Sequence, residues 1–348
     1  MQDILTCAMG LDIHRDVIVA CLAKGELGTD PEIEIRSFST LIPEMRKLRD
    51  WVLEAECRYV AMESTGIYWQ PIYKMLEPCF DGQISILVVN ARHMKNVPGR
   101  KTDMRDAQWI ATLLRAGLLK GSFIPDKTFR ELRHLTRYRK SIVRDITAQK
   151  NRIDKFLQSS GFRFTAFLSD AFGASGRNII RHLMEYGNIS REALDRCLKT
   201  QTRKRIDEIL IALNGSLSEH QRGFLRMIFG HLEALEQHRH TVEDAITKEI
   251  TKHEEALSLL CSIPGIDVTA AAAIIAEIGT DMSAFPDSQH ICSWAGLSPG
   301  NNESAGKRKS AHINKGNPYL KSMLCEVGWV ISGKRTLYLS GWYWRIKQ

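Results

Sequence analysis

Four acidic side chains in the first third of the chain have the types and spacing of a metal site. Asp12 and Glu63 each end an apolar run, and Asp103 and Asp106 stand three residues apart at the head of a helix-like stretch. Strand ends and one helix face can converge in space, so the four carboxylates are predicted to form one cluster. Two carboxylates about 4 Å apart repel by about 4 kcal/mol at an effective dielectric of about 20. Such a cluster needs cations, and hard oxygen ligands favour Mg²⁺ or Mn²⁺.

The elements that must position these acids follow from the hydrophobic pattern. Apolar or alternating runs predict strands at residues 4–13, 17–23, 33–40, 59–65 and 84–90. Helical spacing predicts helices at residues 43–55, 67–77 and 102–117. Three strands, then helix, strand, helix, strand and helix is the order of a ribonuclease-H domain. We therefore predict an α/β, RuvC-like ribonuclease-H domain over residues 1–125.

The net charge of +8 is concentrated in one segment. From Lys127 to Lys155 the chain has ten Lys or Arg and three Asp or Glu, which gives this segment a charge of +7. Localised positive charge favours a polyanionic partner. The residues predicted to contact nucleic acid here are Arg130, Arg133, Arg137, Arg139, Lys140, Arg144, Lys150 and Arg152.

Heptad spacing predicts that residues 126–258 form a long helical arm. The first apolar stripe consists of Leu132, Leu135, Ile142, Ile146, Ile153 and Phe156, with Arg139 and Gln149 in its gaps. The second consists of Leu225, Ile228, Leu232, Leu235, Val242, Ile246, Ile250 and Leu257, and Arg239 interrupts it. The two helices are expected to pair as a coiled coil, antiparallel or across subunits, and an ordinary helical bundle is the alternative. The insert at about residues 160–216 has no assigned task.

Residues 259–348 are predicted to form a mainly α-helical third domain. Pro264 and Gly265 make a tight turn between two helix-like runs, a helix-hairpin-helix pattern. Such a turn either presents backbone N–H groups to phosphates or serves packing alone.

A basic loop of small residues follows this turn. From Ser304 to Lys321 there are five Lys or Arg and no acid. The loop is no Walker A motif, because Lys307 is followed by Arg308 and not by Ser or Thr, so we exclude an ATPase. A serine needs a base, a metal or positive charge to become a nucleophile. Ser304 is the preferred candidate, Ser298 and Ser310 compete with it, and a plain turn residue is the alternative. The cations predicted to hold phosphate are Lys307, Arg308, Lys309 and Lys315.

Other classes of protein are disfavoured by composition. The eight cysteines form no C-x-x-C pair, so neither zinc nor a disulfide scaffold is expected. The amino terminus lacks the pattern of a signal peptide. The longest candidate membrane run, residues 268–279, is too short and contains Glu277. We expect no membrane association and a reducing cytoplasmic location.

These motifs together resemble the transposases of the 110 family of insertion sequences, to which the pilin-gene inverting recombinases are related. Besides Asp12 and Glu63, the resemblance rests on K-T-D-x-x-D-A, S-I-P-G-I, A-G-L-S-P, E-S-A-G-K-R and K-G-N-x-x-L, which begin at Lys101, Ser262, Ala295, Glu303 and Lys315. It extends from near Met9 to about Trp344. Family members generally continue into another helix, so the resemblance implies a chain shortened at its carboxy end.

The resemblance implies a DNA transposase that exchanges strands. Asp12, Glu63, Asp103 and Asp106 would be its DEDD set and bind Mg²⁺, and Ser304 would attack DNA to form a phosphoserine link. The implied partners are element ends and target DNA, a guide noncoding RNA of the element, and further copies of the chain in a dimer or tetramer. The alternatives are a junction-resolving nuclease that uses metal-activated water, and a truncated copy that binds nucleic acid without cutting it.

Overall fold

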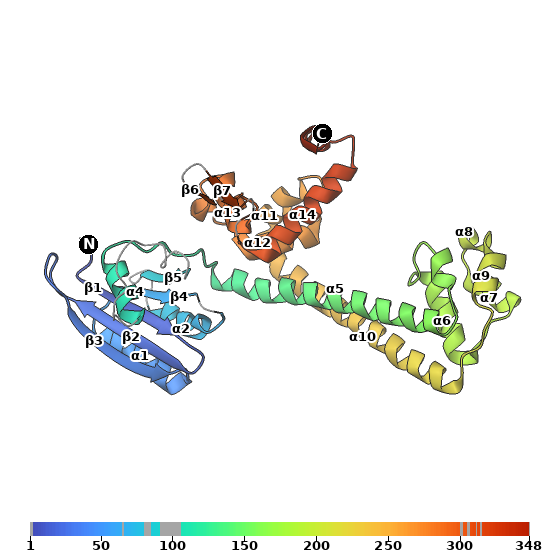
Figure 1. Ribbon diagram of the computed structural model, residues 1–348, viewed down its shortest axis with the longest axis horizontal. Helices are drawn as coiled ribbons and strands as arrows, with labels where there is room; N and C mark the ends of the chain where they lie inside the picture. The colour runs from blue at the N-terminus through green and yellow to red at the C-terminus, as the bar shows by residue number, and fades with distance from the viewer. Residues whose placement is uncertain are drawn as a thin grey trace. The chain divides into compact units, whose positions relative to one another are not determined.

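The computed structural model describes residues 3–64, 66–79, 85–90, 106–299, 302–304, 307–310, 312–313 and 315–347. The chain divides into two compact units, Met1–Ile124 and Pro125–Gln348 (Figure 1). The boundary thus lies one residue before the one predicted from the sequence. Within the described ranges, the structure contains no helix with the length and apolar character needed to cross a membrane.

A five-stranded sheet is the centre of the first unit. Its strands are β1 (Cys7–Ile13), β2 (Val17–Lys24), β3 (Glu32–Ser39), β4 (Tyr59–Glu63) and β5 (Ser85–Val89). They lie in the order β3-β2-β1-β4-β5, and β1, β2 and β3 are antiparallel neighbours, whereas β4 runs parallel to both β1 and β5. This mixed α/β arrangement confirms the predicted order of elements. The assignment to the RuvC-like class stays a prediction.

Helices cover both faces of this sheet. They are α1 (Ile42–Glu54), α2 (Trp69–Leu76), a short 3₁₀ turn η1 (Glu77–Cys79) and α4 (Asp106–Arg115). Because successive strand side chains point to opposite faces, Met9 and Leu11 of β1 pack in the core that contains Leu48 of α1. Ala8, one residue away, packs with Ile110 of α4 on the other face.

A glycine lets α4 approach β1 closely. A Cβ at Gly10 would lie 2.2 Å from the carbonyl oxygen of Ala107 and 2.4 Å from the backbone nitrogen of Ala111, so no larger residue fits there. The helix runs antiparallel to the strand, since its last residue, Arg115, accepts a hydrogen bond from the backbone N–H of Ile4. The first residue of α4 therefore lies toward the carboxyl end of β1.

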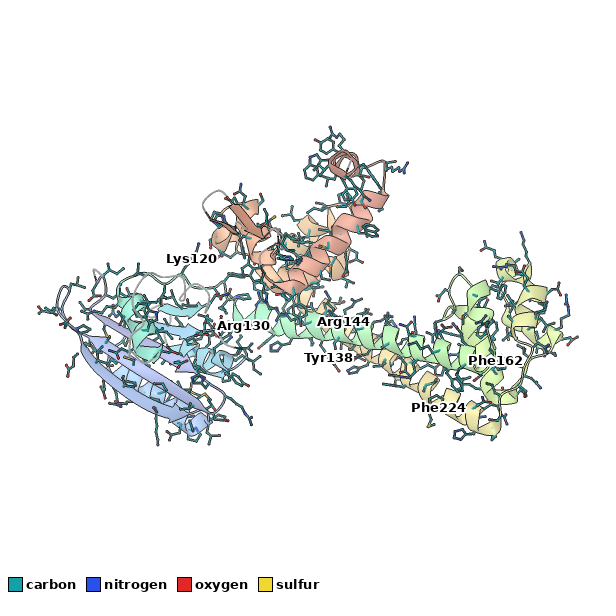
Figure 2. All side chains as sticks on the ribbon, viewed as in Figure 1. Lys120, Arg130, Tyr138, Arg144, Phe162 and Phe224 are labelled. Atoms are coloured by element: carbon teal, nitrogen blue, oxygen red, sulfur yellow. The ribbon has the colours of Figure 1, made fainter. Side chains whose placement is uncertain are left out.

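Two long helices, α5 (Lys127–Ser159) and α10 (Glu219–Ile250), form the arm in the second unit (Figure 1). Their pairing is antiparallel. Tyr138, labelled in Figure 2, contacts His238 through a 2.9 Å hydrogen bond. The ring of Phe156 lies 5.0 Å from that of Phe224. The long helices and their antiparallel pairing follow the heptad pattern, but α10 ends at Ile250, so Leu257, the last residue of the second predicted stripe, lies in a separate helix, α11 (Glu254–Cys261). The coiled-coil supercoil stays a prediction.

Polar residues in the gaps of the heptad pattern have partners inside the arm. Gln149 is buried, and its side-chain amide donates a 2.6 Å hydrogen bond to the carbonyl oxygen of Ile228. Arg139 forms an ion pair of 2.7 Å with Glu243. These contacts explain why neither gap is occupied by an apolar residue.

The insert between the long helices folds into a small helical cap whose apolar side chains belong to the same core as those of the arm. Its elements are η2 (Phe164–Phe167), α6 (Ala174–Tyr186), α7 (Arg191–Cys197), α8 (Thr200–Arg203) and α9 (Ile206–Ala212). Phe162 and Phe164 are fully buried there together with Ile180 and Leu194. Figure 1 shows this cap at the end of the arm where α5 ends and α10 begins.

The rest of the second unit is mainly helical, as predicted. It contains η3 (Thr251–His253), α11 (Glu254–Cys261), α12 (Val268–Ile278), η4 (Met282–Ala284), α13 (Ser288–Ala295), β6 (Asn302–Ser304), β7 (Lys307–Ser310), α14 (Pro318–Gly333) and α15 (Tyr338–Lys347). Ala272 and Ile275 of α12 belong to the same core as Phe129 and Leu132 of α5. The arm and these helices therefore share one apolar core.

The helix-hairpin-helix turn lies between α11 and α12, where the sequence predicts it. Gly265 has a φ of +92°, a conformation that favours glycine. A Cβ at this position would lie 3.1 Å from a side-chain carbon of Ile331 on α14. This close contact supports the packing interpretation of the turn.

Candidate active site

Asp12, Glu63 and Asp106 are brought to one face of the sheet. In the parallel ladder of β1 and β4, Leu11 is paired with Met62, so the next residues, Asp12 and Glu63, stand at the same level at the strands' carboxyl ends. Asp12 shares its face of β1 with Gly10, which α4 contacts through Ala107. Asp106 directly precedes that alanine. Sheet register and helix position thus bring three of the four predicted acids together, and Asp103 lies outside the described residues.

The electrostatics of Asp12 reflect this convergence. Burial raises the pKa of Asp12 above its ordinary value, and the negative charges of Asp106 and Glu63 raise it further. His14 opposes them with its charge and with a 3.2 Å contact between its Nε2 atom and the Asp12 carboxylate. The Asp12 side chain is 16% exposed, whereas the His14 side chain is 60% exposed. The site therefore disfavours the charged form of its own carboxylate, which is the condition that a bound cation relieves.

The donor chemistry of these acids fits a hard divalent cation. Carboxylate oxygens are the ligands that Mg²⁺ and Mn²⁺ prefer, and Asp106 and Glu63 lie close enough to Asp12 to raise its pKa. Within the described ranges, no three His, Cys, Asp or Glu side chains are grouped tightly enough to hold a metal ion. The residues that would hold Mg²⁺ are Asp12, Glu63 and Asp106, with Asp103 as the fourth predicted ligand.

Ser304 lies in a short antiparallel hairpin. It ends β6 and is paired with Lys307, the first residue of β7, and the ladder continues with Glu303 opposite Arg308. An isolated bridge between Pro299 and Ile313 closes the base of this segment. The backbone therefore brings the predicted nucleophile and the first predicted phosphate-binding cations to one end of the hairpin.

The chain that follows the hairpin is anchored to the helices beneath it. The backbone N–H of Asn317 donates to the carbonyl oxygen of Trp294 over 2.8 Å, and a Cβ at Gly316 would lie 2.2 Å from the backbone nitrogen of Gly296. The Asn317 side chain caps α14 by accepting hydrogen bonds from the N–H groups of Tyr319 and Leu320. The K-G-N motif thus joins α13 to α14 in a fixed geometry.

A buried glutamate connects this anchor to the arm. Glu277 is 2% exposed, and its carboxylate accepts two 2.8 Å hydrogen bonds from Arg137 and one of 2.7 Å from Asn317. Arg133 lies 3.0 Å from the same carboxylate and donates to the backbone oxygens of Ala276 and Glu277. Burial lowers the pKa of Arg133 to about 10, although Glu277 opposes this effect. One carboxylate therefore links α5, α12 and α14.

The predicted nucleic-acid-binding residues that the structure describes thus form two groups. The first group has hydrogen-bond or ion-pair partners within the chain, and the second consists of the remaining residues. Arg130, Arg133, Arg137, Arg139 and Arg152 all have hydrogen-bond or ion-pair partners within the chain. Lys150 lies 5.6 Å from the ring of Phe172, Lys140 is half-buried, and Arg144 and Lys315 are exposed. The side chains of Lys307, Arg308 and Lys309 lie outside the described residues. Contact with nucleic acid stays a prediction for every member of both groups.

Glu277 received no structural role in the sequence analysis. The sequence did contain a signal for a buried, paired charge, because Glu277 is the one charged residue in the otherwise apolar or small run from Val268 to Gly279. A charged side chain that a helix buries needs a partner. The pattern alone does not identify that partner, since Arg137 lies 140 positions earlier in the chain.

Comparison with known proteins gives these sites a context. The model of the DEDD transposase domain of IS110 elements, described as a transposase, matches residues 9–161, and the model described as transposase of the IS116/IS110/IS902 family matches residues 257–343. The y4qE protein of Sinorhizobium fredii, named as a transposase, is 23% identical over 247 residues. The 43.6 kDa protein of insertion element IS110 from Streptomyces coelicolor is 28% identical over 239 residues.

The extent of these similarities differs between the chains. The alignments cover 68% and 63% of this chain, but only 51% and 58% of the Sinorhizobium and Streptomyces proteins. The first matched segment contains Asp12, Glu63, Asp103 and Asp106, and the second contains Glu277 and Ser304. The sheet with its convergent acids and the hairpin with its serine therefore lie in segments that match transposase models. Both segments are similar to the IS110 family of insertion-element transposases.

Proposed function

We propose that this protein is a Mg²⁺-dependent DNA transposase that cuts and rejoins strands at the ends of its insertion element and at a target. The observation that carries the proposal is the convergence of Asp12, Glu63 and Asp106 on one face of the sheet. Like charges do not gather for the benefit of stability, so the cluster is best explained by a cation and a phosphodiester. Both transposase family matches support this interpretation.

The acids would hold Mg²⁺ beside the phosphodiester that is cut. A bound divalent ion polarises a phosphoryl oxygen and stabilises the attacking and leaving oxygens. The three described acids come from β1, β4 and α4, two strands and one helix. Rigid elements position such ligands more accurately than loops do.

Ser304 would supply the nucleophile. Its hydroxyl oxygen attacks the phosphorus, the bond from phosphorus to a sugar oxygen breaks, and the departing sugar oxygen takes up a proton. The product is a phosphoserine link, which conserves one phosphodiester so that a second strand can replace the serine without an external energy source. Lys307 is paired with Ser304 in the hairpin, and its cationic side chain together with that of Arg308 would neutralise the phosphate that is attacked.

The further partners of this proposal are nucleic acid and other copies of the chain. A guide noncoding RNA of the element and assembly into a dimer or tetramer are implied by the family resemblance. Support for a polyanionic partner comes from the charge of +7 between Lys127 and Lys155. Shared assembly would allow the acids of one copy to act with the serine of another.

The test is a denaturing gel of the full chain with Mg²⁺, element-end DNA and the flanking noncoding RNA. A covalent protein–DNA adduct is expected with the wild-type chain and is expected to disappear in Ser304→Ala. Ser310→Ala is the matched control, because Ser310 lies in the same hairpin and is one of the two competing serines. The amount of adduct that this variant forms should equal the amount formed by the wild-type chain.

Other results would identify the alternatives. Nicked DNA without an adduct, at the same rate in Ser304→Ala, would mean a nuclease that uses water. An adduct that persists in Ser304→Ala but vanishes in Ser310→Ala would move the nucleophile to Ser310. Binding without any cleavage in Mg²⁺ or Mn²⁺ would mean a protein that holds nucleic acid and does not cut it.

A further inference from the structure

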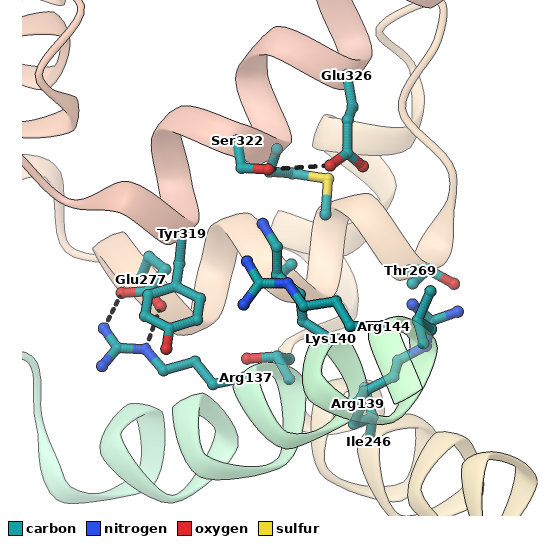
Figure 3. Close-up of a pocket in the computed structure, with 14 residues that line it drawn as sticks. Arg137, Arg139, Lys140, Arg144, Ile246, Thr269, Glu277, Tyr319, Ser322 and Glu326 are labelled. Carbon is teal, nitrogen blue, oxygen red and sulfur yellow. Dashed lines mark hydrogen bonds and ion pairs between the residues drawn. The ribbon is translucent and has the colours of Figure 1, made fainter. Parts of the chain in front are cut away.

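A cavity of about 340 Å³ lies within the second unit, where α5 faces α12 and α14 (Figure 3). This volume lies within the range of small-molecule pockets. Its walls contain four cationic side chains, all from α5, and two carboxylates, Glu277 and Glu326. The excess of cations over carboxylates favours an anionic ligand.

Two of the four cations are already engaged. Arg137 is bound to Glu277, and Arg139 is bound to Glu243. Among the described residues, neither Lys140 nor Arg144 forms an ion pair. These two side chains lie four positions apart on α5, so that they share one face of the helix, and both line the cavity (Figure 3). They form a pair of cations that a phosphate could bridge.

The remaining walls are suited to an aromatic base. Val143, Ala273 and Met323 contribute apolar surface to the cavity. Beside them, the hydroxyl of Ser322 donates a 3.0 Å hydrogen bond to the carboxylate of Glu326, a pair able to contact polar base edges. Cations together with an apolar wall and a few polar groups are what a nucleotide needs, whereas a free phosphate would gain nothing from the apolar side.

The recessed position of the cavity determines which nucleic acid can reach it. A double helix carries its phosphates on a convex, stiff surface, and its bases are stacked inside. A cavity of this volume accepts one nucleotide that has left the stack, as in enzymes that extrude a base, or one from a single strand. The ligand is therefore an unpaired nucleotide.

We propose that this cavity binds one unpaired nucleotide of the DNA or RNA on which the protein acts, with its phosphate on Lys140 and Arg144 and its base against Val143 and Met323. The proposal rests on the proposed function, since that function supplies the nucleic acid. DNA and RNA share this chemistry, and separate probes distinguish them.

The first experiment measures fluorescence anisotropy of the full chain with labelled oligo-dT and oligo-U of about twelve nucleotides. The variant Lys140→Ala/Arg144→Ala is compared with Lys127→Ala/Lys155→Ala, which removes the same charge from exposed positions of the same helix. The cavity variant should lose about tenfold or more in affinity relative to its control. Because two phosphate contacts disappear, the slope of log affinity against log salt should fall by about 1.4. Equal losses in the two variants would overturn the proposal.

A substitution that is expected to raise the affinity provides a second test. Glu326→Gln removes a negative charge from the cavity wall and keeps the side-chain size, so it should raise the affinity for the same oligonucleotides a few-fold at low salt. Unchanged or lower affinity in this variant would contradict an anion in the cavity. If oligo-U responds and oligo-dT does not, the ligand is RNA, and the reverse result identifies DNA.

Photocrosslinking then locates the base. Oligonucleotides that carry 4-thiothymidine or 4-thiouridine should crosslink to the peptide that contains Tyr319 and Met323, and an unlabelled duplex should compete poorly. Crosslinks found only elsewhere would overturn the cavity assignment. A wild-type chain that forms the Ser304 adduct without this crosslink would refute the cavity alone, and the crosslink without any adduct would refute the proposed reaction alone.

Discussion

In the first unit Asp12 is partly buried beside two further carboxylates, and both burial and these charges raise its pKa, whereas in the second unit two guanidinium groups and an amide surround one buried carboxylate. The cluster around Glu277 satisfies its own charges, so it explains how α5, α12 and α14 hold together. The cluster around Asp12 gathers three carboxylates of like charge. Stability therefore accounts for the second cluster, and the proposed cation accounts for the first.

The largest effect is expected when one acid is removed from the first cluster. Asp106→Asn should reduce Mg²⁺-dependent strand cleavage by about hundredfold or more, since metal-assisted charge stabilisation contributes several kcal/mol to the barrier. Nucleic-acid binding and the fold should be retained, because Asn keeps the size and the hydrogen-bonding capacity of the side chain. Asp16→Asn, at an 83% exposed side chain of the same unit, is the control for cleavage rates. Cleavage that survives in Asp106→Asn would refute the metal site.

In the second cluster the same kind of change should affect stability. Glu277→Ala leaves Arg133 and Arg137 without their shared partner, and breaking a buried ion pair costs about 3–5 kcal/mol. Hydrogen exchange in α12 and in the start of α14 should accelerate accordingly, because both helices meet at this carboxylate.

Glu243→Ala provides the matched control for that change. Glu243 also binds an arginine of α5, but the Glu243 and Arg139 side chains are 29% and 24% exposed. More exposed ion pairs contribute about 0–1 kcal/mol, so exchange in α12 and α14 should change little. A similar response in the two variants would show that Glu277 does not link these helices.

A third test concerns the packing that places Asp106. Gly10→Ala puts a Cβ 2.2 Å from the carbonyl oxygen of Ala107, so α4 must move away from β1. Overpacking of this kind costs about 1–3 kcal/mol, and cleavage should fall together with the protection of α4 from exchange.

Gly230→Ala is the control, since its Cβ meets no atom within 4 Å. It should stabilise α10 by about 1 kcal/mol or less. Unchanged cleavage and exchange in Gly10→Ala would contradict the close approach.

The smallest effect is expected from the pH dependence of Asp12. A carboxyl whose pKa is raised by folding makes the folded state bind protons more tightly, so stability falls as pH rises through the folded pKa. Without divalent cations, Asp12→Asn should therefore slow hydrogen exchange in β1 at neutral pH, by under about 1 kcal/mol of opening free energy. Below the ordinary pKa of aspartate the two proteins should be equal. Mg²⁺ should slow exchange only in the wild-type chain, and a wild-type chain indifferent to Mg²⁺ would contradict cation binding.

Local pattern was sufficient to predict the elements of the first unit, whereas the strands β6 and β7 lie where the sequence predicted a loop. Strand alternation gave the five strands and helical spacing gave the helices between them, because the apolar side chains of each element must face a core. The two heptad stripes likewise indicated long helices and the residues of their seam, and Gln149 was recognised as an interruption. The sequence could not reveal that Gln149 bonds to the backbone of Ile228, since that contact joins positions 79 apart.

Charge pattern was a weaker guide than apolar pattern. The basic segment of α5 predicted contacts with nucleic acid, yet Arg137 and Arg139 have partners within the chain, and both line the same cavity as Lys140 and Arg144. Periodicity tells which face of a helix a residue occupies. It does not tell what stands opposite that face.

The sequence by itself determined the order of elements, the acids at the ends of strands, and the family motifs that surround Ser304. Tertiary structure decided which charges meet. Parallel register sets Asp12 level with Glu63, Gly10 admits the helix that carries Asp106, and packing of α12 on α5 brings Glu277 to Arg137. The physical reason is the distance along the chain over which each effect acts. Backbone preferences and hydrophobic periodicity act over a few residues, whereas electrostatic contacts depend on distances that only the folded chain fixes.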